Sequence, residues 1–205
     1  MFYTQSSSRL LRAPAHRLLQ WAGACLLLLC GAAALAALRP NTPDPRLTFP
    51  RIQAAGGVLP VDASAQMPST TAVHKLYVDV DGDESSHHGV NARLNTAAKI
   101  LNLYALAGVP ADKVQLVILF YGHGVNLALS DEAYQARFHR ANPNAKLLAE
   151  LGGAKVKMVA CGQALGHQSF TLADLHSGIT LALSALTARE ELQAAGYGVV
   201  PKEPE

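Results

Sequence analysis

Cys161 is the residue of this chain whose type and position point most directly to chemistry. It follows residues 156–160, in which apolar side chains alternate, and Gly162 comes directly after it. The alternation predicts a strand, and the glycine predicts a sharp turn into a short helix over residues 163–165. A thiol at such a junction lies beside backbone N–H groups and a positive helix end, which favour the reactive thiolate. The alternative is a small buried side chain without chemistry, since free cysteines are usually buried.

Histidines and aspartates follow the other predicted strands. Functional groups gather at the carboxyl ends of parallel strands, so a thiol and up to four imidazoles are expected along one rim. A histidine near Cys161 would generate or stabilise its thiolate, and His123 and His167 are the candidates. The alternative for each histidine is a solvated or backbone-bonded loop residue. The reactive side chains expected at this rim are Asp81, Asp83, His87, His88, His123, Cys161 and His167.

Metal binding is a second interpretation of the same side chains. Cysteine and histidine are ligands of zinc and copper, and His87, His88, His123 and Cys161 would have to supply them from separate loops. No CxxC or HxxxH spacing supports such a site. The sequence therefore predicts neither a resident metal nor a cofactor, and a metal-binding protein stays an alternative.

The first 37 residues resemble an export signal. Arg9, Arg12 and Arg17 form a positive start, no charged residue occurs from position 18 to 38, and residues 34–36 read Ala-Leu-Ala, a small-x-small cleavage pattern. The alternative is a retained membrane anchor, because about 20 uncharged residues can span a bilayer. In either case the positive flank is expected to stay cytoplasmic and the rest to be exported, which in a bacterium means the periplasm.

Charge and cysteine content narrow the function classes further. The net charge is +2, but without the first 37 residues the chain keeps 14 basic and 15 acidic residues, so nucleic-acid binding is not expected. Cys25 and Cys30 fall in the signal segment, which leaves Cys161 alone in the exported part. A single cysteine forms no internal disulfide and in an oxidising compartment suggests a reactive thiol or an intermolecular partner.

Strand and helix patterns alternate from about residue 73 to the end. The preceding residues 38–72 are rich in proline and show no helical or strand period, so they are expected to form an extended lead-in that packs through Phe49, Ile52, Val58 and Leu59. The alternation predicts a three-layer α/β/α sandwich with a mostly parallel sheet of about five strands. The predicted strands are residues 75–80, 114–121, 156–161, 179–183 and 197–200; the main predicted helices are 91–107, a short one from Ser130, 145–151 and 184–195.

Five short motifs occur in order along this part of the chain. They are NLYALAGVP at 102–110, DEAY at 131–134, NPN at 142–144, CGQAL at 161–165 and ALSALTA at 182–188. Together they resemble the DsrE/DsrF-like family of sulfur-relay proteins, and in particular its exported members with a proline-rich lead-in, from about residue 49 to the end.

The resemblance implies a three-layer α/β/α fold with a five-stranded sheet, homo-oligomers that are often trimers or hexamers, and a cysteine that carries sulfane sulfur as a persulfide. Cys161 matches that position. One departure concerns the loop after the second strand, which usually reads His-Gly-Pro-Ala in the family and here reads His-Gly-Val-Asn from His123. The lost proline weakens the role assigned to His123.

Two functions from different classes follow. In the first, an exported sulfur carrier or sulfurtransferase-type relay takes sulfur onto Cys161 from a donor, which is a small molecule or a protein, and passes it to an acceptor thiol. In the second, a non-catalytic oligomeric module with the same fold binds a small ligand, a partner or a metal at this rim, and Cys161 is only packed. Membrane contact is expected only through the N-terminal segment if it is not cleaved.

Overall fold

The computed structural model describes residues 44–82 and 89–202 of the chain. The predicted export signal and three of the predicted rim residues, Asp83, His87 and His88, lie outside these ranges. Residues from Pro45 onward form one compact unit. No helix within the described ranges is long and apolar enough to cross a membrane.

The centre of the unit is a parallel sheet of five strands in the order β4-β3-β2-β1-β5. Hydrophobic β2 lies in the middle, as expected for a strand covered on both faces. The fold class predicted from the alternating pattern is therefore confirmed. The strands are β1 (His74–Val80), β2 (Val114–Phe120), β3 (Lys157–Cys161), β4 (Ile179–Ala182) and β5 (Gly198–Val199).

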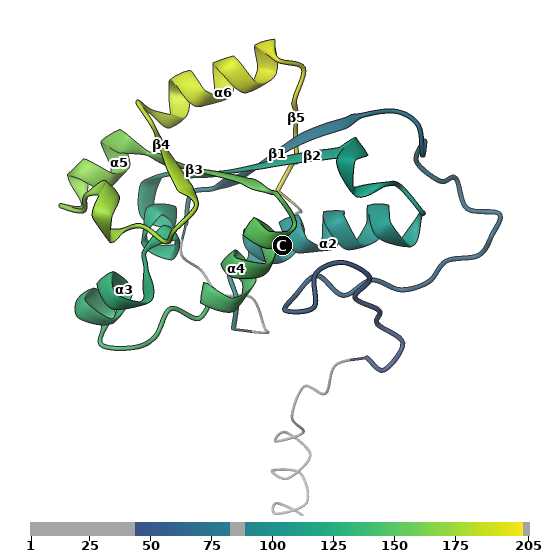
Figure 1. Cartoon of the computed structure of the whole chain (residues 1–205), viewed down its shortest axis with the longest axis horizontal. Helices are drawn as coiled ribbons and strands as arrows, with labels where there is room; N and C mark the ends of the chain where they lie inside the picture. The colour runs from purple at the N-terminus through teal and green to yellow at the C-terminus, as the bar shows by residue number, and fades with distance from the viewer. Residues whose placement is uncertain (1–43, 83–88, 203–205) are drawn as a thin grey trace, which may run out of the picture. The chain divides into compact units, whose positions relative to one another are not determined.

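Helices cover the two faces of the sheet unequally. On one face lie α2 (Ala92–Leu106), α3 (Asp131–Phe138) and α4 (Ala145–Gly153), and on the other lies α6 (Ala185–Ala194) (Figure 1). The short helix α5 (Gly162–His167) continues directly from the end of β3. Three further turns are 3₁₀-helical: η1 (Ala111–Lys113), η2 (Gly122–Ala128) and η3 (Leu172–Asp174).

Side chains alternate along the strands between a large and a small core. The large core fills the α2/α4 side and includes Val78, Ile118 and Met158. The small core fills the α6 side, and Cys161 belongs to it. This alternation follows from the two-residue period of a strand, and it places the thiol under α6.

The helix starts match the capping residues in the sequence. The Asn91 side chain caps α2, the Ser130 hydroxyl caps α3 and the Ser184 hydroxyl caps α6.

The ends of two elements differ slightly from the prediction. The structure continues α4 through Gly152 and Gly153, and Lys155, at φ 63°, is the left-handed residue that follows it. The predicted strand 197–200 is shorter, because only Gly198 and Val199 pair with β1.

The lead-in is attached to the rest of the unit at several points. Ile52 is buried in the large core, and Val58 is buried where it pairs with Thr48. Phe49 is half-buried and packs against Gly57, whereas Leu59 is exposed, so its predicted packing role was wrong. Five hydrogen bonds join Asn102 of α2 to the backbone of residues 51–56.

Candidate functional site

Cys161 is both the last residue of β3 and the residue that caps α5. Its Sγ accepts hydrogen bonds from the backbone N–H of Ala185 at 3.2 Å and of Ala164 at 3.5 Å. The residue is only 5% exposed. The thiol thus has both the N–H contacts expected of a reactive cysteine and the burial expected of an inert one.

Gly162 brings the end of β4 close to the thiol. Cys161 and Ala182 are partners in the β3–β4 ladder. A Cβ on Gly162 would lie 2.9 Å from the carbonyl oxygen of Ala182 and 3.3 Å from that of Leu183, so only glycine fits there without a shift. The chain then turns at Ser184 into α6, whose first N–H reaches Sγ. The thiol contact therefore depends on a glycine next to it in sequence and on the distant turn at Ser184.

Tyr121 directly follows β2, the strand next to the one that ends at Cys161. Phe120 and Ala160 are partners in the β2–β3 ladder, so the residues after them lie side by side, about 4.8 Å apart in the pairing direction. The Tyr121 ring packs on the same small core as the thiol. The carboxyl edge of the sheet therefore carries a phenol next to a thiol under α6.

A charged pair lies against the Tyr121 ring. Arg189 of α6 donates from Nε to both carboxylate oxygens of Asp79 at 3.2 Å, and its Cζ lies 4.3 Å from the centre of the ring. Burial, followed by the charge of Asp79, raises the pKa of the Tyr121 phenol above its ordinary value. The phenol is therefore a hydrogen-bond donor at neutral pH.

A second ion pair lies one residue beyond β1. Lys202 donates to Asp81 at 2.6 Å. Burial acts to raise the pKa of Asp81, but the hydrogen bond from Lys202, a backbone hydrogen bond and the charges of Lys202 and Arg93 together outweigh it, and the pKa is lowered. Of the predicted rim aspartates, Asp81 is thus a partner of the C-terminal tail.

The two candidate histidines are exposed. His123 lies in η2 and His167 in the last turn of α5, about 8 Å along the helix from the Cys161 end. Within residues 44–82 and 89–202, the hydrogen bonds of Cys161 go to backbone N–H groups and not to an imidazole. The same ranges contain no group of three His, Cys, Asp or Glu side chains placed to hold a metal ion.

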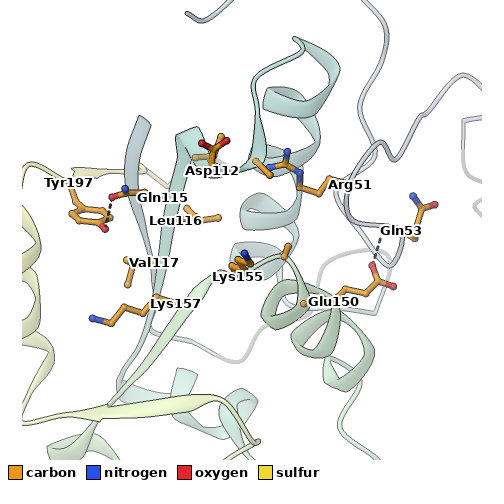
Figure 2. A pocket seen from close by; sticks show the side chains of 14 residues that line it. Arg51, Gln53, Asp112, Gln115, Leu116, Val117, Glu150, Lys155, Lys157 and Tyr197 are labelled. Atoms are coloured by element: carbon orange, nitrogen blue, oxygen red, sulfur yellow. Dashed lines mark hydrogen bonds between the residues drawn. The ribbon is translucent and has the colours of Figure 1, made fainter. Parts of the chain in front are cut away.

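Among the hollows lined by described residues, one lies near the thiol and a larger one lies at the opposite end of the sheet. A hollow of about 440 Å³ lies between α6 and β2–β4, and its lining includes Val159 and Ala182, neighbours of the thiol. A larger one, about 960 Å³, opens at the amino ends of β2 and β3, away from Cys161 (Figure 2). There Glu150 accepts bonds from the backbone N–H of Gln53 and Ala54, so it anchors the lead-in.

Comparison with known proteins places the chain in a family. The sequence model of the DsrE/DsrF-like family matches residues 78–201, which include the edge residues described above except Lys202. The chain belongs to the DsrE/DsrF-like family.

Five chains among the solved structures match this DsrE/DsrF-like chain, and no functionally curated protein does. One of these neighbours is a protein of unknown function from Methanobacterium thermoautotrophicum, with 19% sequence identity and a TM-score of 0.43. The aligned part covers 62% of this chain and 97% of the neighbour.

Three residues of the DsrE/DsrF-like edge were missed by sequence reasoning: Asp79, Tyr121 and Arg189. A lone acid inside the apolar first strand and a tyrosine at the end of the second were the available signals. Arg189 offered none, because 110 positions separate it from the aspartate that it binds.

Proposed function

We propose that this protein carries sulfane sulfur as a persulfide on Cys161. The supporting observation is the pair of backbone N–H groups that donate to Sγ at the carboxyl end of β3, in a family generally associated with sulfur relay. N–H donors of this kind stabilise a sulfur anion.

The proposed cycle has two displacement steps. The Cys161 thiolate attacks the sulfane sulfur of a donor, a new S–S bond forms, and the donor's leaving group departs with the electron pair of the broken bond. An acceptor thiolate then attacks the outer sulfur, and the Cys161 thiolate leaves with the electron pair of the S–S bond. Sγ carries negative charge before the first step and after the second, so the two N–H donors assist both.

The burial of Cys161 favours a second candidate. A thiol that is 5% exposed meets a donor only if the start of α6 moves or if the hollow under α6 admits the donor. If neither occurs, the protein is a binding module that uses the same edge without thiol chemistry.

Sulfur uptake and release distinguish the two candidates. After exposure of the full chain to polysulfide, peptide mass spectrometry should find one added sulfur atom on Cys161, removable by a reductant. The Cys161→Ser variant should lack it. Capture alone is insufficient, because any exposed thiolate can be sulfurated, so transfer to an added acceptor thiol must also be seen. A Cys161 that resists alkylation until the protein is denatured would establish the binding module instead.

A further inference from the structure

Arg189 is held at the carboxyl edge in a way that leaves part of its guanidinium available. Nε is bound by the Asp79 carboxylate, and the plane lies over the Tyr121 ring. Within residues 44–82 and 89–202, the hydrogen bonds of Arg189 pass through Nε, and the two Nη groups have no partner. The side chain is 26% exposed, so it can be reached from solvent.

Two independent chains of contacts connect the guanidinium of Arg189 with the thiol of Cys161. Along α6, Arg189 follows Ala185 by four residues, which puts it on the same helix face and about 6 Å further along the axis. Ala185 is the residue whose N–H donates to Sγ of Cys161. Across the sheet, Tyr121 lies beside Cys161 and carries the guanidinium on its ring. Both routes place the guanidinium at the same edge and on the same face of the sheet as the reacting sulfur.

Among the described residues, the charged side chains at this edge of the sheet favour binding of an anion. Among the described residues, Arg93 from the first turn of α2 donates to the backbone carbonyls of Asp79, Val200 and Pro201 and to no carboxylate. Together with Arg189 and Lys202, Arg93 brings the number of cations to three. The described carboxylates at this edge are two, Asp79 and Asp81. A planar guanidinium with two free amino groups is the side chain best suited to grip an oxyanion through two parallel hydrogen bonds.

We propose that the Nη groups of Arg189 bind the anionic end of the sulfur donor, which makes the substrate a small anionic sulfane-sulfur compound of the thiosulfate type. This inference rests on the proposed function of Cys161. In the reaction, the thiolate attacks the sulfane sulfur of thiosulfate, the bond between the two donor sulfurs breaks, and sulfite leaves with its electron pair. Charge balances, since a thiolate and a dianion give a persulfide anion and the sulfite dianion. Arg189 holds the oxygens of the departing sulfite.

A measurement of thiosulfate binding tests the proposed role of Arg189 without requiring any reaction of the thiol. In calorimetric titrations, the unreactive Cys161→Ser chain should bind thiosulfate, and adding Arg189→Gln should weaken binding at least about tenfold, the size expected for losing a charged hydrogen bond. Arg137→Gln is the matched control, because Arg137 also lies over an aromatic ring, Phe170, but belongs to α3 on the other face. Equal binding by the Arg189 and Arg137 variants, or none by the Cys161→Ser chain, would overturn the inference.

Alkylation gives an independent readout on the native thiol. Iodoacetate and iodoacetamide are nearly equal in shape but differ in charge, so their rate ratio at Cys161 measures the preference for an anion. Arg189→Gln should lower this ratio several-fold, and an unchanged ratio would contradict the inference. Asp79→Asn, which breaks the ion pair but keeps the cation, should retain the preference. If thiosulfate binds through Arg189 but no sulfur reaches Cys161, the proposed function fails while the anion site stands.

Discussion

At the scale of single residues, two opposing effects act on the Cys161 sulfur. The N–H groups of Ala164 and Ala185 stabilise a negative charge on it, whereas burial removes the water that would also do so. Both effects depend on the same few atoms, because the start of α6 supplies the shorter of the two bonds and also covers the thiol. Reactivity is therefore set by how closely β4 and α6 approach the end of β3.

The contact at Gly162 makes this dependence testable. Gly162→Ala adds a methyl group 2.9 Å from the carbonyl oxygen of Ala182. The end of β4 must shift, so we expect a loss of about 1–3 kcal/mol in the free energy of unfolding by urea, together with a changed rate of Cys161 alkylation.

Gly166→Ala is the matched control for that substitution. Gly166 belongs to the same short helix, but a Cβ there meets nothing within 4 Å. Stability should stay the same or rise by up to about 1 kcal/mol, because alanine favours a helix more than glycine does. Equal destabilisation by both alanines would show that the close approach to β4 is not what requires Gly162.

Sequence reasoning located the thiol and its strand, but not the side chains around it. The signal for Cys161 is local, since alternation and a following glycine mark the end of a strand. Arg189 and Tyr121 become neighbours of Cys161 only through the strand order and the crossover into α6. His123 and His167 were chosen for their residue type, and the structure exposes both.

At the scale of elements, order and type were predictable because each element carries its own signal. The polar caps Asn91, Ser130 and Ser184 and the apolar periods are read within one segment. The hydrogen bonds that attach the lead-in to α2 could not be predicted from a single segment. Its bonds to Asn102 span 46 to 51 positions, and an asparagine inside a helix looks like any surface residue until the fold buries it.

Asn102 should therefore be the most sensitive polar residue of α2. Its Oδ1 accepts from the N–H groups of Arg51 and Ile52, and its Nδ2 donates to three carbonyls of residues 52–56. Asn102→Ala leaves several buried backbone groups without partners, at about 1–3 kcal/mol for each. We expect a loss of at least ~3 kcal/mol in urea unfolding and faster proteolysis of the lead-in.

Asn95→Ala provides a graded control on the same helix. Asn95 makes one bond to the lead-in, accepting from the N–H of Gly56 at 2.9 Å. Its replacement should cost about 1 kcal/mol. If the two variants were equally stable, the lead-in would be held by apolar contacts such as that of Ile52 rather than by the Asn102 bonds.

At the scale of the whole molecule, the exposed leucines at the start of α6 bear on oligomeric assembly. Leu183 and Leu186 flank the start of α6 and are 73% and 76% exposed. Apolar side chains this exposed are often covered in an oligomer, and the family resemblance implies a closed homo-oligomer. Light scattering on residues 45–205 should therefore give a mass above one chain, and a clean monomer at micromolar concentration would contradict this.

The role of the two leucines in assembly can be tested separately. Leu183→Asp combined with Leu186→Asp should lower the mass, whereas Leu172→Asp, at an exposed leucine of η3, should not. A partner copy that covers these leucines would also lie beside Cys161. Assembly and sulfur uptake are then expected to change together in the double variant.

Export and signal cleavage would determine which thiols accompany Cys161 in the mature protein. With Cys25 and Cys30 removed in a cleaved signal, Cys161 would be the only thiol of the mature chain, free to form a persulfide but not an internal disulfide. The Ala-Leu-Ala pattern at 34–36 predicts a mature N-terminus near Leu38, and sequencing the N-terminus of the protein from its native host would test this. A membrane-bound product that starts at Met1 would establish the retained anchor, and Cys25 and Cys30 would then remain in the protein. Sulfur uptake must in that case be mapped to Cys161 by peptide and not by total mass.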